Sequence, residues 1–281
     1  MPSVAPLVLL AAALLRIPAR RMRALARGED GALRDWLANE SVIRLAEARR
    51  DARFALARLE ALGGRVVAIE DTDYPAGLRE LSDAPAFLTV RGTLPARSRW
   101  REGTAIVGSR TPDARAVRAA RALAAALPGP IVSGLARGID AAAHEGALAS
   151  GTPTLAYVGH GLGNTYPPEH RALEDRIVAA GGAILSETLP DEAVTKWSLV
   201  RRDRLQAAHA VAIVLVQSDA QGGAMHALAA AQRLGRSRFA FEARGAASYG
   251  GNERALADGA RTLPWDVRRA AATVGSFTLN G

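Results

Sequence analysis

Residues 104–151 constrain the fold most, because this stretch alternates short apolar runs with glycine turns and alanine-rich helical segments. Thr104–Val107 is an apolar, β-branched run, and a second such run begins at Ile131. A helix that opens at Pro112 separates the two runs, since proline suits a first helical turn, and a second helix is expected to start near Ile139. Two strands joined through a helix predict a right-handed βαβ unit and hence a mostly parallel α/β sheet.

The turns that follow the two strands predict a phosphate site. Both lie at the carboxyl edge of the expected sheet, where open α/β sheets bind ligands, and both lead into helix N-termini, which favour anions. Glycines at positions 108, 134 and 138 let a phosphate approach the backbone. Arg110 and Arg137 lie in the same turns and can bind phosphate oxygens through two parallel hydrogen bonds. The alternative interpretation is a structural turn with solvated arginines.

Two common nucleotide-binding motifs are missing from this region. A dinucleotide-binding turn has the pattern GxGxxG after the first strand and an acid after the second, whereas the first turn here is GSRTPD and the second strand ends in Ser133. A P-loop requires a lysine, and the single lysine of the chain, Lys196, lies elsewhere. These patterns argue against both nucleotide-binding classes.

The segments after residue 151 continue the same alternation. Buried strands are expected at 152–158, 183–186, 211–216 and 239–241, and helices at 168–180 and 224–234. Glu187 ends one of these strands, and we expect it to contact Arg110 or a backbone N–H group rather than to act as a base. His160 is expected to lie in a glycine turn near the ligand, and His144 to pack within a helix.

The first 62 residues have the pattern of a small helical domain. Helices are predicted at Val4–Leu15, Ala19–Ala26, Ala32–Glu40 and Val42–Leu62. The first is too short to cross a bilayer, which needs about 20 apolar residues, so no membrane partner and a cytoplasmic location are expected. Residues 63–103 supply lead-in strands near 65–69 and 87–91 and a charged connector.

Composition indicates the type of partner but not its identity. The 281 residues carry a formal charge of +8, which favours a polyanionic partner, although an arginine-rich and alanine-rich composition also arises from codon bias. The chain contains no cysteine, which excludes disulfides and thiolate metal sites. No patterns typical of metal sites or of serine hydrolases occur, so neither metal, cofactor nor catalytic residues are predicted.

The motifs along residues 70–265 resemble those of the DNA-processing protein A family, also called DprA or Smf. The resemblance rests on GSR after the first strand, SGLARGIDAAAHEGAL after the second, GHGLGNTYP at Gly159–Pro167 and the closing pair GGN and DGA. The run at Arg201–Arg204 resembles the family's F-P-x-R-N-R segment. It departs from that segment because Leu199 and Val200 replace the Phe-Pro pair and Asp203 replaces the asparagine.

This resemblance implies a Rossmann-like sheet domain at 104–265, preceded by the helical domain and the lead-in segment and followed by a tail at 266–281. It implies a non-catalytic protein that binds single-stranded DNA, assists loading of the recombinase RecA during natural transformation, and forms a homodimer. Only about 16 residues follow Trp265, so the winged-helix module of many relatives is not expected. The residues expected to contact DNA phosphates are Gly108, Ser109, Arg110, Ser133, Gly134, Arg137, Gly138, Gly159, Gly161, Arg201, Arg202, Arg204, Gly222 and Gly223.

A second function class remains open from the sequence. Nucleotide sensors and phosphoribohydrolases share the implied fold, and the hydrolases carry PGGxGTxxE. The corresponding segment here, Gln221–Ala227, reads QGGAMHA and lacks both the threonine and the glutamate. This departure counts against the hydrolase and leaves a nucleotide sensor as the alternative.

Overall fold

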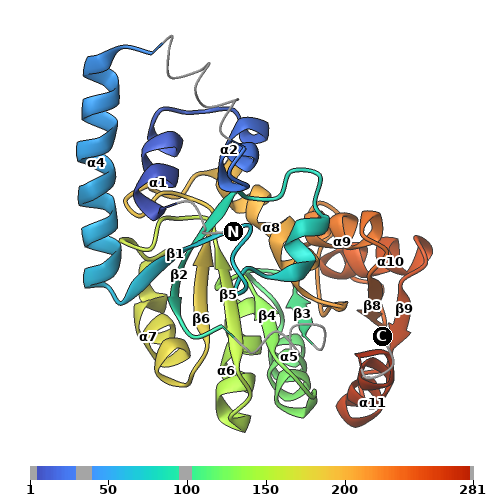
Figure 1. Cartoon of the computed structure of the whole chain (residues 1–281). Helices are drawn as coiled ribbons and strands as arrows, with labels where there is room; N and C mark the ends of the chain where they lie inside the picture. The colour runs from blue at the N-terminus through green and yellow to red at the C-terminus, as the bar shows by residue number, and fades with distance from the viewer. Residues whose placement is uncertain (1–4, 30–39, 95–102, 279–281) are drawn as a thin grey trace.

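A single nine-stranded sheet organises the computed structural model, which describes residues 5–29, 40–94 and 103–278. In spatial order its strands run β1-β2-β6-β5-β4-β3-β7-β8-β9 (Figure 1). The strands, in chain order, are β1 (Gly64–Ala68), β2 (Phe87–Gly92), β3 (Thr104–Val107), β4 (Ile131–Ser133), β5 (Thr154–Val158), β6 (Ala183–Ser186), β7 (Ala212–Leu215), β8 (Ser237–Phe241) and β9 (Arg261–Leu263).

The strand order creates a topological switch point beside β3. From β3 the chain builds the sheet in one direction through β4, β5 and β6, and then returns to add β7, β8 and β9 on the other side of β3. These seven strands are parallel, whereas β1 and β2 pair antiparallel at the β6 edge. The α/β class and the mostly parallel sheet are thus confirmed. Ligands of such sheets bind outside the carboxyl ends of the strands at this switch point.

Helices cover both faces of the sheet because side chains alternate between its faces along each strand. On one face, Ile106 of β3 and Val214 of β7 pack against helices that include α5 and α6. On the other face, Val107 and Leu215 pack in the core that includes α8 and α9. The helices of the sheet region are α5 (Ala114–Ala126), α6 (Ile139–Ser150), α7 (Arg171–Ala179), α8 (Lys196–His209), α9 (Ala224–Arg233), α10 (Gly250–Ala257) and α11 (Val267–Thr278), with short 3-10 turns η1 (Ala76–Glu80), η3 (Pro168–His170) and η4 (Ala247–Tyr249).

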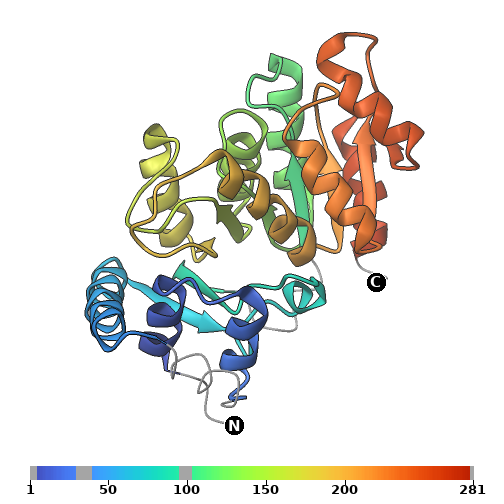
Figure 2. The ribbon, with the colours of Figure 1, turned by 90° about the horizontal axis from the view of Figure 1, so that it is seen from above.

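The N-terminal helices gather beside β1 and β2 at one side of the molecule (Figure 2). They are α1 (Pro6–Leu14), α2 (Ala19–Ala26) and α4 (Val42–Ala61). Leu9, Leu10 and Met22 are buried in the same core as the strands, so these helices pack on the sheet region. The helix expected at 32–40 and most of the connector before 103 lie outside the described residues. No helix in the described part has the length and apolarity needed to span a membrane.

The C-terminal segment, expected only as a tail, carries the helix α11. Its residues Ala270 and Val274 are buried in the core that α5 forms with the sheet. Phe277 packs edge-on against Phe239 of β8, with 5.5 Å between ring centroids. The short strand β9, which the sequence pattern did not predict, pairs with β8 and brings the chain to this position. The sheet region therefore extends at least to Thr278.

Candidate functional site

The turn after β3 is held between α6 and the end of β7. A Cβ atom on Gly108 would lie 2.6 Å from Cγ1 of Ile139 and 2.7 Å from the Gln217 carbonyl oxygen, so this position requires glycine. The backbone N–H of Ser109 donates to the same Gln217 carbonyl at 2.7 Å. These contacts fix the turn, and Arg110 at its tip is exposed to solvent.

The turn after β4 serves mainly to seat a buried arginine. A Cβ on Gly134 would lie 1.5 Å from Nη1 of Arg202, so the guanidinium of Arg202 rests directly on this glycine. Ser133 is fully buried and its hydroxyl donates to the Ile106 carbonyl at 2.7 Å. Gly138 adopts φ 77°, a left-handed conformation that favours glycine, where α6 begins. These three residues therefore support the side chains and turns around the cavity, but they do not themselves line it.

Arg202 joins two buried acids from different elements. Its Nη2 lies 3.6 Å from Oδ2 of Asp140 on α6, and its Nη1 lies 3.2 Å from Oδ1 of Asp203, the next residue on α8. Burial raises the pKa of Asp203 to about 6, although the positive charge of Arg202 acts in the opposite direction. Burial raises the pKa of Asp140 as well, again against the charge of Arg202. The cluster thus holds one cation and two acids inside the protein.

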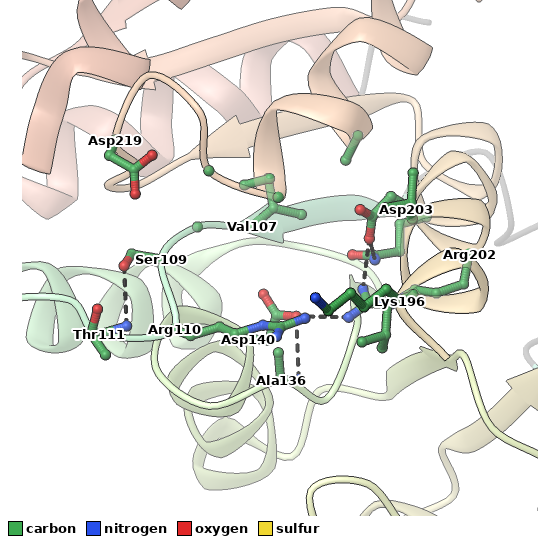
Figure 3. A pocket seen from close by; sticks show the side chains of 18 residues that line it. Val107, Ser109, Arg110, Thr111, Ala136, Asp140, Lys196, Arg202, Asp203 and Asp219 are labelled. Carbon is green, nitrogen blue, oxygen red and sulfur yellow. Dashed lines mark hydrogen bonds and ion pairs between the residues drawn. The ribbon is translucent and has the colours of Figure 1, made fainter. Parts of the chain in front are cut away.

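A cavity of about 440 Å³ opens between the ends of β3 and β7 and the side of α8 (Figure 3). This volume is within the range of small-ligand pockets. Figure 3 shows the side chain of Arg110 reaching from the β3 turn toward Asp140. The residues lining the cavity are Val107, Gly108, Ser109, Arg110, Thr111, Ala136, Asp140, Lys196, Leu199, Val200, Arg202, Asp203, Gln206, Asp219, Gly222, Gly223, Ala224 and Ala227.

The rim of this cavity offers groups that suit an anion. Arg110 and Lys196 are exposed, and neither forms a hydrogen bond or ion pair with any residue that the structure describes. Helix α9 begins at the rim with Gly223 as its N-cap, and no described side chain caps it. Uncapped N–H groups and the helix dipole favour a negative charge there. No described atom would lie within 4 Å of a Cβ on Gly223, so this glycine faces open space.

Three other residues expected to contact phosphate have structural contacts and do not line the cavity. Arg137 pairs with Glu169 on the surface. A Cβ on Gly159 would lie 3.0 Å from the backbone nitrogen of Leu199, so this glycine lets the start of α8 approach the sheet. A Cβ on Gly161 would lie 2.0 Å from the Leu189 carbonyl oxygen. The close approach of backbone segments, rather than of a ligand, accounts for both glycines.

Glu187 contacts Arg201 and Arg204, whereas Arg110 or a backbone N–H group was expected. It accepts hydrogen bonds from Arg201 at 2.8 Å and from both terminal nitrogens of Arg204, at 2.8 and 2.9 Å. The expected contact with Arg110 does not form, because β6 is separated from β3 by β5 and β4. Arg204 also donates to Asp83 at 2.7 Å. The two arginines are therefore held in place by acids on neighbouring elements.

A second cavity of about 440 Å³ adjoins the first. Arg201 and Arg204 line it together with Trp197, whose side chain is 69% exposed. Arg233 of α9 also lines it and has no ion-pair partner among the described residues. Val200 lines both cavities, so the two openings are neighbours on the same side of α8.

The two histidines singled out from the sequence are buried and do not line either cavity. His144 contacts the Thr154 hydroxyl at 2.7 Å through Nδ1, and burial lowers its pKa to about 3. His160 lies 1% exposed beside Glu174, and burial lowers its pKa too. His144 packs inside the fold as expected, and His160 is buried in its glycine turn and lines neither cavity.

Sequence reasoning missed several residues that line the first cavity. Lys196, Gln206 and Asp219 were not expected there, and Asp203 was expected only as an acid among arginines. The spacing of Leu199, Arg202, Asp203 and Gln206 is i, i+3, i+4 and i+7, which places them on one face of α8. This helical periodicity is the sequence signal that could have identified the residues of α8 that line the cavity. Among the described residues, no group of three or more His, Asp or Glu is arranged to hold a metal ion.

The family to which the chain belongs follows from a match over most of its length. Residues 65–272 match the family model described as DNA recombination-mediator protein A. The chain belongs to this family. The DNA processing protein DprA of Streptococcus pneumoniae is 33% identical over 175 residues, which cover 62% of this chain and 61% of that protein. Members of the family are thus named as DNA-processing proteins.

Two solved structures of family members resemble the model. The X-ray structure of DprA from Streptococcus pneumoniae superposes with a TM-score of 0.76 at 23% identity, covers 98% of both chains, and shows the shared fold. DprA from Helicobacter pylori, described for its unique single-stranded DNA binding mode, gives a TM-score of 0.64 at 27% identity. It covers 75% of this chain and 95% of that one. The chain spans between 44% and 61% of the length of three curated relatives.

Proposed function

We propose that the chain binds single-stranded DNA at the carboxyl edge of its sheet and catalyses no reaction there. The observation that carries the proposal is the cavity at the switch point beside β3. Its rim combines the N-terminus of α9, which no described side chain caps, with two cations, Arg110 and Lys196, that form no ion pair with a described residue. A backbone phosphate placed at this rim would meet N–H donors and positive charge together.

The similarity to the Helicobacter pylori protein supports a single strand as the ligand. That protein is described for its single-stranded DNA binding mode and is 27% identical to this chain. The second cavity provides a path for a neighbouring nucleotide, because Val200 borders both openings. Trp197 is exposed beside Arg201 and Arg204, and an aromatic ring there can stack on a base. A flexible strand can follow these closely spaced sites better than a rigid duplex.

The family resemblance extends this proposal to the cellular role. We infer that the chain protects incoming single strands, assists loading of RecA during natural transformation, works as a homodimer, and acts in the cytoplasm. Binding assays with DNA test whether the chain binds single strands. A test of RecA loading requires RecA in the assay.

The test compares two exposed arginines at one fixed salt concentration and then over a salt series. Arg110→Ala removes the cation at the tip of the β3 turn, whereas Arg118→Ala changes an exposed arginine in the middle of α5. We expect Arg110→Ala to weaken binding of single strands of every sequence. It should also flatten the dependence of log K on log salt by about 0.7, the value for one phosphate contact on a single strand. Fluorescence anisotropy with a labelled oligonucleotide measures both quantities.

Arg118→Ala should leave affinity and slope close to those of the unchanged chain. Equal losses from both variants would indicate a diffuse effect of positive charge and would contradict a site in the cavity. Equal affinity for single strands and blunt duplex of the same length would also contradict the proposal. Tight binding of free mononucleotides with no binding of strands would favour the nucleotide-sensor alternative.

A further inference from the structure

The first cavity has cations at its rim but acceptor groups at its floor. Asp203 and Gln206 line it from α8; Gln206 is fully buried, and the side chain of Asp203 is 13% exposed. Asp140 lines it from α6 and is also buried. A floor built to hold phosphate would offer donors, since phosphate oxygens accept hydrogen bonds and are negatively charged. These acids therefore suit a different part of a ligand.

The hydrogen bonds of the floor are incomplete: acceptor atoms of Asp203 and Gln206 lack partners among the described residues, and so does one donor, the buried Nε of Arg202. Oδ1 of Asp203 lies 3.2 Å from Arg202 Nη1 and accepts from Gln206 Nε2 at 3.2 Å. Oδ2 of Asp203 has no hydrogen-bond partner among the described residues. Oε1 of Gln206 is buried and likewise has no described partner. Buried polar groups are nearly always paired in proteins, so the unpaired Oε1 of Gln206, beside an accessible carboxylate oxygen of Asp203, indicates a ligand that carries N–H donors.

The balance of charge at the floor supports the same conclusion. Arg202 forms the ion pairs with Asp140 and Asp203, and the charge of Arg110 also acts on both acids, so the acids lie at the floor and the exposed cations lie at the rim. Arg110 and Lys196 lie at the exposed rim, where they can meet a phosphate. A nucleotide has this polarity, with a negative phosphate at one end and N–H donors on the base at the other.

We propose that Asp203, supported by Gln206, reads the edge of one nucleobase inside this cavity, and that guanine fits it best. This inference rests on the proposed binding of single-stranded DNA. The Watson–Crick edge of guanine presents two adjacent donors, N1–H and the N2 amino group, which match the two oxygens of a carboxylate. Adenine and cytosine present one amino group beside an acceptor, and thymine presents one N–H between two carbonyl groups. A single unpaired strand can turn a base into such a pocket.

The test uses the full chain and four labelled oligonucleotides at one salt concentration. One is all thymidine, and the other three carry a single central deoxyguanosine, deoxyinosine or deoxycytidine. The deoxyguanosine strand should bind at least about fivefold more tightly than the all-thymidine strand, the low end of the discrimination given by a bidentate contact. Inosine lacks the N2 amino group, so its strand should lose a measurable part of this gain. Guanosine monophosphate should likewise compete better than thymidine monophosphate.

Two variants with the same change of charge separate base reading from general electrostatics. Asp203→Asn should abolish the guanine preference, measured as the ratio of the affinities for the deoxyguanosine and all-thymidine strands. Asp219→Asn removes a negative charge from the rim of the same cavity and should preserve the ratio between the two strands. Circular dichroism checks that both variants are folded, and the comparison of oligonucleotides on the unchanged chain needs no variant.

The outcomes distinguish this inference from the proposed function. Tight binding of all four strands with equal affinity would overturn guanine reading and leave single-strand binding intact. Absence of binding to every strand would overturn the proposed function itself. A guanine preference that persists in Asp203→Asn would overturn the role of Asp203.

Discussion

At the scale of single residues, the site depends on the contrast between buried and exposed charge. Arg202 is 4% exposed and lies between two acids, whereas Arg110 is exposed and forms no hydrogen bond or ion pair with a described residue. Breaking a buried pair typically costs about 3–5 kcal/mol, while an exposed pair contributes about 0–1 kcal/mol. Arg202 therefore shapes the cavity, and Arg110 is available to a ligand.

Asp203 should make stability depend on pH. Burial raises its pKa from 3.8 to about 6 against the opposing charges of Arg202 and Arg110, and Asp140 adds a like charge. A raised folded pKa means that the folded state binds the proton more tightly, so the contribution of Asp203 to stability is greatest below pH 4 and is lost as the pH rises through 6. Asp203→Asn removes this loss. Relative to the unchanged chain, Asp203→Asn should therefore gain up to about 3 kcal/mol in the free energy of unfolding between pH 4 and pH 8, since one pKa unit corresponds to about 1.4 kcal/mol.

Urea denaturation of both chains at the two pH values measures this difference. Asp219→Asn, which changes an exposed acid, provides the control and should show no such pH dependence. An Asp203→Asn chain that is less stable than the unchanged one at pH 8 would show that the carboxylate contributes favourably through Arg202.

At the scale of elements, the N-terminus of α9 and one face of α8 form opposite sides of the cavity. The first turn of α8 is closed by a capping box, in which Thr195 and Ser198 satisfy each other's backbone N–H groups. α5 is capped by Asp113, which accepts from the Ala116 N–H at 2.8 Å. α9 begins with glycine and has no described side-chain cap, so it is the helix end best suited to an anion among these three.

Gly223→Ala tests whether a ligand approaches α9 closely. Gly223 has φ −56°, and an added Cβ would meet no described atom within 4 Å, so the fold should tolerate alanine within about 1 kcal/mol. A phosphate against the backbone would meet the new methyl group. We therefore expect weaker binding of single strands, measured by anisotropy, at nearly unchanged stability.

The matched control is Gly275→Ala, a glycine in α11 whose Cβ would lie 3.8 Å from the nearest atoms, in Pro128. It should leave binding unchanged. If Gly223→Ala binds as tightly as the unchanged chain, no ligand reaches the backbone at this helix end, and the phosphate site must lie elsewhere on the rim.

At the scale of the whole molecule, much of the positive charge is used in ion pairs that link the parts of the fold. Arg58 of α4 lies 2.7 Å from Asp191, and Arg236 lies 2.9 Å from Glu80. Pairs like these are exposed on at least one side and contribute little each. The net charge of +8 therefore describes an overall attraction to polyanions, while the position of binding depends on which cations remain unpaired at the switch point.

The C-terminal helix α11 contributes to the core of the molecule, and a matched pair of variants tests this contribution. Val274 of α11 is fully buried, and Ala272 on the same helix is exposed. Val274→Asp places an unpaired charge in the core that α11 shares with α5 and β8, so we expect a loss of more than about 3 kcal/mol or failure to fold. Ala272→Asp should cost less than about 1 kcal/mol. Urea unfolding measures both; an unchanged midpoint for Val274→Asp would show that α11 does not support the core.

Local sequence pattern was sufficient for the order of most elements. The apolar runs at Thr104–Val107 and Ile131–Ser133 became β3 and β4, and the helix between them begins at Ala114, two residues after the predicted start at Pro112. These features follow from side-chain periodicity, proline and glycine, which act over a few residues. Helix α11 was missed although Ala270, Val274 and Phe277 recur at the helical spacing i, i+4 and i+7.

Tertiary structure alone decided which turns meet and which arginines face the cavity. β3 pairs with β7 across more than 100 residues, as in the partners Thr104 and Ala212, and only this pairing brings Gly223 close to Arg110. In the sequence, Arg201, Arg202 and Arg204 form one basic run. The rotation of α8 against the sheet turns Arg202 inward beside Asp140 and leaves Arg201 and Arg204 with Glu187, because a helix presents successive residues about 100° apart.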